Sequence, residues 1–183
     1  MSRICVVQPP LRVSRDFIDY PYHSDLAVVQ AAAVLGKLGH AVQVVDAFAL
    51  PGADLRELDG DDILLGATVA ETAAAVGECD LVIVRYTPFH RPPHPSAELN
   101  GFLAAVRAAH PATPLALADL YQSGEHYVEA SAADILAAHP LAAAHLKYQA
   151  ESAIGDWAQR VIAGTAAPVT YGPAVADLDS LPL

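Results

Sequence analysis

The chain has 183 residues, of which 54% are hydrophobic and 17% are charged, and its formal net charge is -11. This size and composition are typical of one globular core with a short tail, and the ten scattered lysines and arginines form no basic stripe for nucleic acid or an acidic membrane surface. No apolar run approaches the roughly 18 residues that cross a bilayer and no signal-peptide pattern is present, so we predict a cytoplasmic protein.

Strand and helix patterns alternate along the chain. Apolar runs predict five strands, at residues 3–7, 41–45, 80–85, 114–118 and 145–147. Helical spacing of apolar residues, with Ser, Thr or Gly at several of the ends, predicts helices between them, at residues 24–38, 68–76, 96–109, 130–138 and 149–163. Residues 54–62 are a polar excursion without a predicted element.

This alternation predicts an α/β fold, a doubly wound, mainly parallel five-stranded sheet flanked by helices, of the flavodoxin-like or Rossmann-like type. We expect residues 1–163 to form this domain. Residues 164–183 contain several prolines and glycines, which predicts a linker or connector lying on the surface.

In an open parallel sheet, ligands bind outside the carboxyl ends of the strands. The loops that follow the first four predicted strands hold most of the candidate chemistry, at residues 8–25, 46–48, 85–94 and 119–127. Aromatic residues concentrate in these loops, which suits a large, flat, partly apolar ligand. Packing of the long loops by the same rings is the open alternative.

Other site chemistries fit the sequence less well. Asp46 ends a strand as a phosphoacceptor does in response regulators, but Gln8-Pro9-Pro10 lacks the acidic pair that such a site needs. His90 and His94, with Asp119, suggest a metal-dependent hydrolase, yet two prolines between the histidines prevent a helix from presenting both rings on one face. The chain also lacks a glycine-rich dinucleotide motif and a Gly-x-Ser-x-Gly elbow.

Three ordered segments carry a resemblance to a known family. They are Val6-Val7-Gln8-Pro9-Pro10, the run at residues 32–42 containing Gly36-Lys37-Leu38-Gly39-His40, and Val45-Asp46-Ala47. With the tail at residues 175–182, this order resembles the N-terminal cobalamin-binding domain of B12-dependent radical SAM proteins. The resemblance implies a flavodoxin-like cobalamin-binding fold that presents a corrinoid cofactor to a radical SAM domain or subunit, for methyl transfer or other radical chemistry.

The sequence also departs from that family. Cys5 and Cys79 are the only cysteines, so the three-cysteine motif is missing and this chain has no residues for the family's iron-sulfur cluster. The chain therefore would not be catalytic alone. The Asp-x-His-x-x-Gly motif that supplies an axial histidine in classical cobalamin domains is absent, and of the family's Gly-Glu-x-Glu turn only Glu151 is present.

The resemblance implies cofactor contacts at the carboxyl ends of the strands. The candidate cofactor-binding residues are Gln8, Pro9, Pro10, Tyr22, His23, Asp46, Ala47, Phe48, Tyr86, Thr87, Phe89, Asp119, Tyr121 and Gln122. No residue is assigned a catalytic or metal-ligating role. The alternative function is a cofactor-free α/β scaffold that acts through protein contacts, with a metal-dependent hydrolase behind it.

Overall fold

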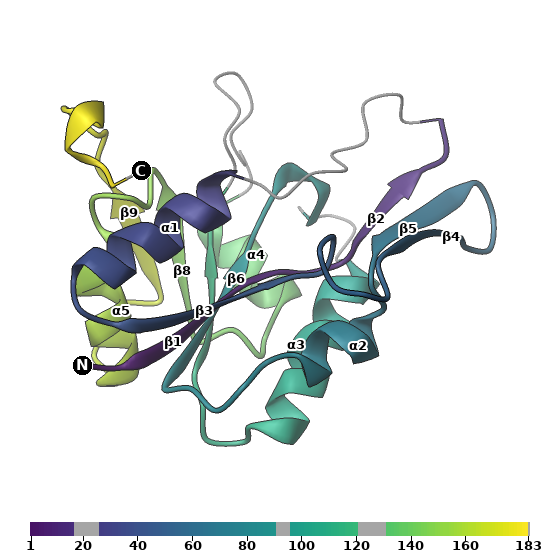
Figure 1. Ribbon diagram of the computed structural model, residues 1–183, viewed down its shortest axis with the longest axis horizontal. Helices are drawn as coiled ribbons and strands as arrows, with labels where there is room; N and C mark the ends of the chain where they lie inside the picture. Colours follow the sequence, from purple (N-terminus) through teal and green to yellow (C-terminus); the bar gives the residue numbers. More distant parts are fainter. Residues whose placement is uncertain (17–25, 91–95, 121–130, 183) are drawn as a thin grey trace.

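The computed structural model describes residues 1–16, 26–90, 96–120 and 131–182. Its main sheet has six strands in the order β3-β1-β6-β7-β8-β9, and every neighbouring pair is parallel (Figure 1). The strands are β1 (Arg3–Gln8), β3 (Ala41–Asp46), β6 (Leu81–Arg85), β7 (Leu115–Ala118), β8 (Ala144–Tyr148) and β9 (Val169–Gly172).

Helices cover both faces of this sheet, which confirms the doubly wound α/β prediction. The helices α1 (Leu26–Lys37) and α5 (Ile154–Ile162) pack on one face, and α2 (Val69–Ala74), α3 (Ala97–Ala109) and α4 (Ala132–Ala138) pack on the other. Alternate side chains of each strand point to opposite faces of the sheet and pack against the helices there. In β1, Ile4 and Val6 join the core under α1, whereas Cys5 and Val7 join the core under α3.

Local signals set several helix ends as the sequence predicted. Thr68 and Ser96, both at predicted helix starts, cap α2 and α3, and Thr68 does so in a capping box with Glu71. Ser131 caps α4, one residue after the start predicted at residue 130. Gly39 follows α1 with a φ of 88°, a backbone conformation that favours glycine.

The sheet has one strand more than the five predicted, because β9 forms within the expected connector. Pro168 and Pro173 bracket this four-residue run, so the sequence alone indicates a linker. The strand pairs with β8, and Tyr148 lies opposite Gly172. A Cβ atom at Gly172 would clash with the carbonyl oxygen of Gln149, so the close approach of the two segments requires glycine there.

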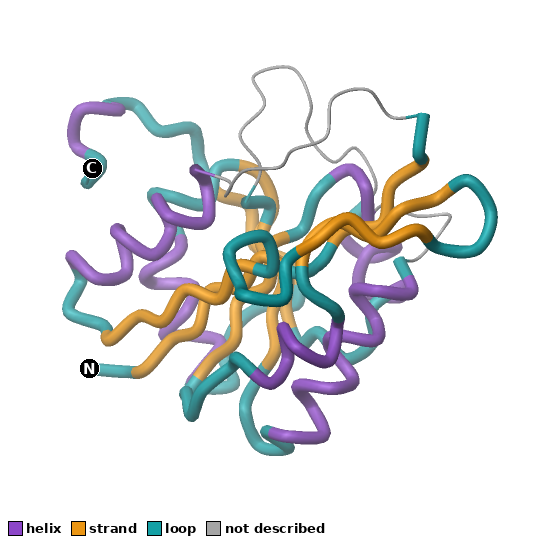
Figure 2. The backbone as a smooth tube through the Cα atoms, turned by 45° about the vertical axis from the view of Figure 1, so that its right-hand side comes forward, coloured by secondary structure: helices purple, strands orange, loops and turns teal. Residues whose placement is uncertain are grey.

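A three-stranded antiparallel sheet projects from the main sheet, at the right-hand end of the view in Figure 1 and in the turned view of Figure 2. Its order is β2 (Leu11–Ser14), β5 (Asp62–Gly66), β4 (Asp54–Glu57). From the sequence, residues 8–25 are expected to form a loop and residues 54–62 a polar excursion, and Ile63-Leu64-Leu65 is assigned to no element, because each of these strands is only four or five residues long. Pairing brings Leu11, Val13, Ile63 and Leu65 into one small core.

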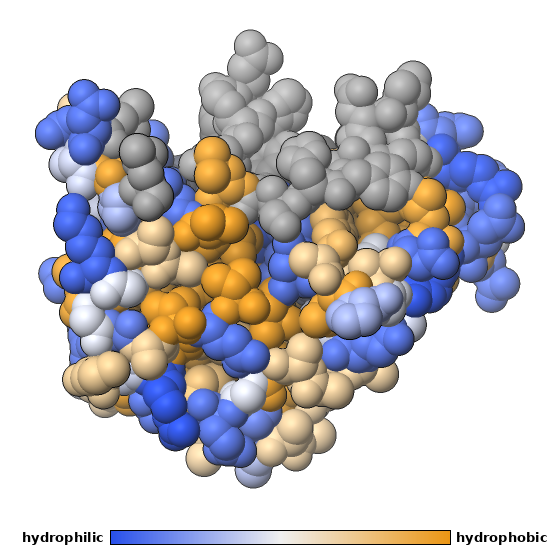
Figure 3. All heavy atoms as spheres, viewed as in Figure 1, coloured by the Kyte–Doolittle hydropathy of each residue, from blue (hydrophilic) through white to orange (hydrophobic). Residues whose placement is uncertain are grey.

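Apolar side chains are exposed on α1 and on the edge strand β3. Leu26 and Val29 of α1 are 61% and 48% exposed, Leu38 directly after α1 is 59% exposed, and Val44 of β3 is 44% exposed. Figure 3 shows apolar side chains gathered on this face. None of the helices in the described ranges combines the length and the apolar character that a membrane span requires.

Candidate functional site

The candidate site lies at the carboxyl edge of the main sheet, where the strand order reverses. The chain leaves β1 for β3 on one side and then crosses to β6 on the other side of β1. Val7 pairs with Val84 and Gln8 pairs with Asp46, so the three strands end at nearly the same level. A reversal of this kind is the usual ligand position in open α/β sheets.

The end of β1 is buried. Gln8, Pro9 and Pro10 have almost no exposed surface, and the Gln8 carbonyl oxygen accepts a hydrogen bond from the Ala47 N–H at 3.0 Å. Proline has no N–H, so two successive residues here offer no backbone donor to a ligand.

The loop after β3 is held against the small sheet. Asp46 Oδ1 accepts the Phe48 N–H at 2.9 Å, and the carbonyl oxygen of the buried Ala47 accepts the Ala67 N–H at 2.7 Å. The half-buried Phe48 ring, with Leu65 and Gly66, lines a cavity of about 250 Å³. Gly66 has a φ of 96°, and a Cβ atom there would lie 2.8 Å from the Phe48 ring.

The loop after β6 turns its polar groups inward, around the short 3-10 helix η1 (Pro88–His90). The Tyr86 hydroxyl donates to the His90 carbonyl oxygen at 2.9 Å, and the Thr87 N–H donates to His90 Nδ1 at 3.2 Å. Tyr86 and Thr87 are both completely buried. Of the predicted residues in this loop, only Phe89 is half-buried, and it packs against the core of the small sheet.

Three buried histidines surround Tyr86. The rings of His90, His139 and His145 lie 5.5 to 5.6 Å from the Tyr86 ring, centroid to centroid. Burial, followed by the charge of Arg85 and the neighbouring His139, lowers the pKa of His90 to about 3. Burial is also the main cause that lowers the pKa of His139, so both imidazoles are neutral at physiological pH.

Asp119, at the end of β7, uses both carboxylate oxygens within the fold. Its Oδ1 lies 2.7 Å from His145 Nε2, and its Oδ2 accepts the Tyr148 N–H at 3.0 Å. From its position in the sequence, Asp119 is a candidate cofactor contact and a partner in the metal alternative. In the structure it links the carboxyl ends of β7 and β8.

The end of β8 contributes residues that the sequence analysis did not select. Lys147 is buried, and burial lowers its pKa while Asp119 opposes the shift. Tyr148 has a φ of 67°, the one positive value among the described residues other than glycine. Its exposed ring lies 5.6 Å from that of Tyr171, and the Lys147 Nζ lies 5.2 Å from the Tyr148 ring centroid. Of these residues, only Lys147 gives a signal in the sequence, namely a charged side chain at the end of the strand predicted at residues 145–147.

Some predicted residues lie outside the described ranges, namely Tyr22, His23, Tyr121 and Gln122, as does His94 of the metal alternative. Within those ranges, no group of three His, Cys, Asp or Glu side chains has a geometry that could hold a metal ion. The two described elements of the metal hypothesis, His90 and Asp119, bond to other parts of the fold instead.

No protein-family model matches the chain, and no curated protein matches it. The function of the site therefore has to be inferred from its own residues and geometry.

Proposed function

We propose that the chain is a cobalamin-binding module that presents a corrinoid cofactor to a radical SAM domain or subunit. The observation that carries this proposal is the position of the candidate residues at the strand-order reversal. Gln8 to Pro10 and Tyr86 to Phe89 follow the two strands that flank this reversal, β1 and β6. Asp46 to Phe48 follow the next strand, β3, at the same edge.

The chemistry of this edge suits a flat, largely neutral cofactor. Pro9 and Pro10 remove two N–H donors that a phosphate would need, and the buried Arg85 donates from Nε to the Leu120 carbonyl oxygen. Phe48 and Phe89 are each half-buried. Rings of this kind contribute large contact areas to a conjugated macrocycle at a small cost in conformational entropy.

The residues of the chain would act by holding and orienting the cofactor. Phe48 and Phe89 would contact its apolar surface, while backbone groups at the ends of β1, β3 and β6 would meet its amide side chains. The hydrogen bonds of Asp46 and Tyr86 within their own loops would keep those loops in place. Bound cobalamin would supply a methyl group or radical chemistry to a substrate held by the partner.

A visible absorption spectrum tests the proposal. The chain is incubated with hydroxocobalamin or methylcobalamin, and free cofactor is removed by gel filtration. We expect retained colour with a base-off spectrum, and loss of retention in Phe48→Ala and Phe89→Ala. Leu141→Ala is the matched control because Leu141 is exposed and precedes β8, at the opposite edge of the sheet. No retained cofactor in a chain with a folded circular dichroism spectrum overturns the proposal.

The second candidate is a cofactor-free domain that binds a protein partner. The exposed apolar residues of α1 and β3 favour it, because such patches mark interaction surfaces. The complete burial of Tyr86 and Thr87 also favours it, since those side chains show no surface to a ligand. This candidate predicts that Val29→Asp and Val44→Asp abolish co-purification with a partner without affecting any cobalamin retention.

A further inference from the structure

The strand β3 ends the main sheet on one side, and its outer edge is open. The N–H groups of Ala41 and Ala47 donate to carbonyl oxygens at or next to the two ends of β1, each at 3.0 Å, so every second residue of β3 bonds to β1. Val42 and Val44 alternate with these residues and direct their N–H and carbonyl groups outward. Among the strands that the structure describes, none pairs with this side of β3.

The sequence of β3 does not protect this edge. Exposed sheet edges are usually blocked by prolines, lysines, bulges or very short strands. The strand β3 has six residues, contains neither proline nor lysine, and pairs with β1 in six consecutive pairs without a bulge. At the other edge of the sheet, β9 has four residues between Pro168 and Pro173. Of these two edges, that of β3 is therefore the more open to a further strand.

The surface beside this edge is apolar and almost uncharged. Val44 of β3 and Val29 of α1 are exposed, and α1 packs next to β3 (Figure 1). Residues 26–45, which span α1 and most of β3, include a single charged residue, Lys37. An exposed apolar surface next to an open strand edge is typical of an interaction site.

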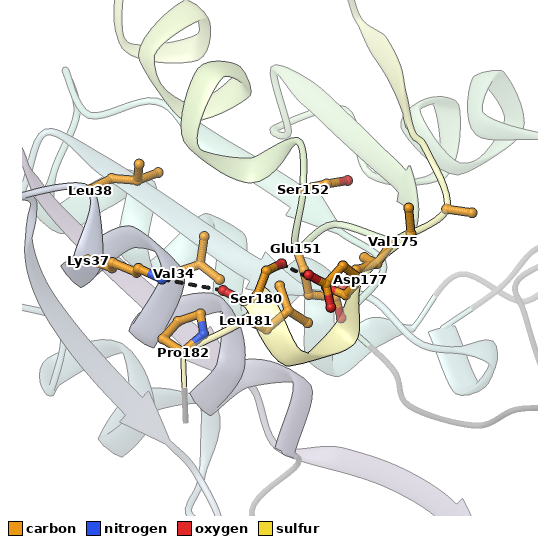
Figure 4. Close-up of a pocket in the computed structure, with 12 residues that line it drawn as sticks. Val34, Lys37, Leu38, Glu151, Ser152, Val175, Asp177, Ser180, Leu181 and Pro182 are labelled. Carbon is orange, nitrogen blue, oxygen red and sulfur yellow. Dashed lines mark hydrogen bonds between the residues drawn. The ribbon is translucent and has the colours of Figure 1, made fainter.

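The charge of Lys37 lies on the other flank of α1. Its Nζ donates to the carbonyl oxygen of Ser180, in the C-terminal segment of residues 173–182, at 3.3 Å (Figure 4). The same segment accepts a hydrogen bond from the Ser152 hydroxyl, in the loop before α5. The segment therefore covers the flank of α1 that faces α5, and it leaves the β3 side of the helix uncovered.

A second copy of the chain fits this edge. With a two-fold axis at Gln43, Val42 of one copy lies opposite Val44 of the other, and each such pair exchanges two N–H···O=C hydrogen bonds. Asp46, the one acidic residue of β3, then lies opposite His40 and not opposite a second acid. Two copies with a formal net charge of -11 repel each other over most of their surface, so a face without net negative charge favours their contact.

We propose that the chain forms a homodimer by antiparallel pairing of the β3 edges of two copies, which joins the two main sheets into one. The backbone groups of Val42 and Val44 form the pairing, and the exposed valines of β3 and α1 become buried beside it. The dimer does not depend on cobalamin, since none of the candidate cofactor side chains takes part in the pairing. Its occupant is a second copy, and not the foreign partner of the second candidate function.

Analytical ultracentrifugation of the purified full chain over a range of concentrations tests the proposal. We expect a concentration-dependent species with twice the chain mass of 19.1 kDa. Val44→Lys should weaken association at least about tenfold, because each dimer carries the new charge twice, close to the two-fold axis. Leu141→Lys is the matched control, since it adds the same charge at an exposed leucine outside α1 and β3, and it should leave the dimer unchanged.

Two cysteine variants test the register. Gln43→Cys should form a disulfide between the two copies on mild oxidation, because a non-hydrogen-bonded antiparallel pair brings its Cα atoms to about 4.5 Å. Ala41→Cys is the control, because residue 41 lies opposite residue 45 of the second copy and the two cysteines are too far apart to bond. The native Cys5 and Cys79 are buried and common to both variants.

Three results would overturn the proposal. They are a monomer at concentrations up to millimolar, an unchanged dimer in Val44→Lys, and a disulfide that forms in Ala41→Cys but not in a Gln43→Cys chain with a folded circular dichroism spectrum. A pure chain that stays monomeric but binds another protein through Val44 also overturns it, and supports the second candidate function instead.

Discussion

Asp119 and His145 form a buried pair that joins the carboxyl end of β7 to the neighbouring strand β8. The His145 side chain has no exposed surface, and the Asp119 side chain is 8% exposed. The second oxygen of the same carboxylate holds the Tyr148 N–H. One carboxylate therefore fixes both the imidazole of β8 and the unusual backbone that follows it.

Asp119→Ala is expected to lower the free energy of unfolding by about 2 to 4 kcal/mol, because it leaves the buried His145 ring without its partner. Urea denaturation measures this change. Asp59→Ala, at an exposed turn, should change stability by no more than about 0.5 kcal/mol. The double variant Asp119→Ala/His145→Leu should cost less than the sum of the single changes; full additivity would show that the two residues do not interact.

Stability should fall as the pH decreases. The pKa of His90 is about 3 in the folded chain against 6.5 as its ordinary value, so between these values only the unfolded chain takes up the proton. The contribution of His90 to the free energy of unfolding should thus be complete above the ordinary pKa. Below it, the free energy of unfolding should decrease by up to about 1.4 kcal/mol per pH unit. Urea denaturation at several pH values between about 5 and 8 measures the slope, and His90→Gln should make it shallower. An unchanged slope in that variant would refute the assignment to His90.

The backbone at Tyr148 should prefer residues that tolerate a positive φ. At a φ of 67°, tyrosine is roughly 1 kcal/mol less favourable than glycine. Tyr148→Gly should leave stability unchanged or raise it slightly, whereas Tyr148→Val should be about 1 kcal/mol or more less stable than the glycine variant. Thermal unfolding compares them. Tyr171→Val, within β9, controls for loss of the ring pair, and a valine variant as stable as the glycine variant would contradict the prediction.

Gly66→Ala and Gly60→Ala form a matched pair that tests how closely the loop after β3 packs on β5. Both glycines have positive φ, but only Gly66 has neighbours, with the Ala47 carbonyl oxygen 2.9 Å from the position of a Cβ atom. Gly60→Ala should cost about 1 kcal/mol in the free energy of unfolding, and Gly66→Ala at least about 1 kcal/mol more. Equal costs in urea denaturation would mean that the contact with Ala47 relaxes freely.

The elements that the sequence predicts well are those with local causes. The caps at Thr68 and Ser96 and the apolar runs of β1 and β6 depend on neighbouring residues, and all of these appear in the structure. The small antiparallel sheet depends on pairing between β2 and β5, which lie about fifty residues apart, and strands of four or five residues are too short for their pattern to reveal such pairing.

The features of the candidate site also divide into those that local sequence predicts and those that depend on distant residues. Strand ends locate the carboxyl edge, so Asp46 and Tyr86 lie where the sequence predicts. The direction of the Tyr86 side chain could not be predicted, because it depends on a hydrogen bond to His90 and on the two further histidines that surround its ring. The role of Asp119 was equally hidden, since His145 lies on another strand.

Gly172 gives the fold a marker that can be read in other sequences. No side chain fits between β9 and Gln149, so any chain that forms β9 in this way must keep glycine at this point. This glycine lies a fixed distance after Lys147 and Tyr148 at the end of β8. In an alignment of related sequences, the residue at this position can therefore separate two groups. Chains with glycine there would pair a strand of their own tail with the β8 edge, and chains with a larger residue would leave that edge open to another strand.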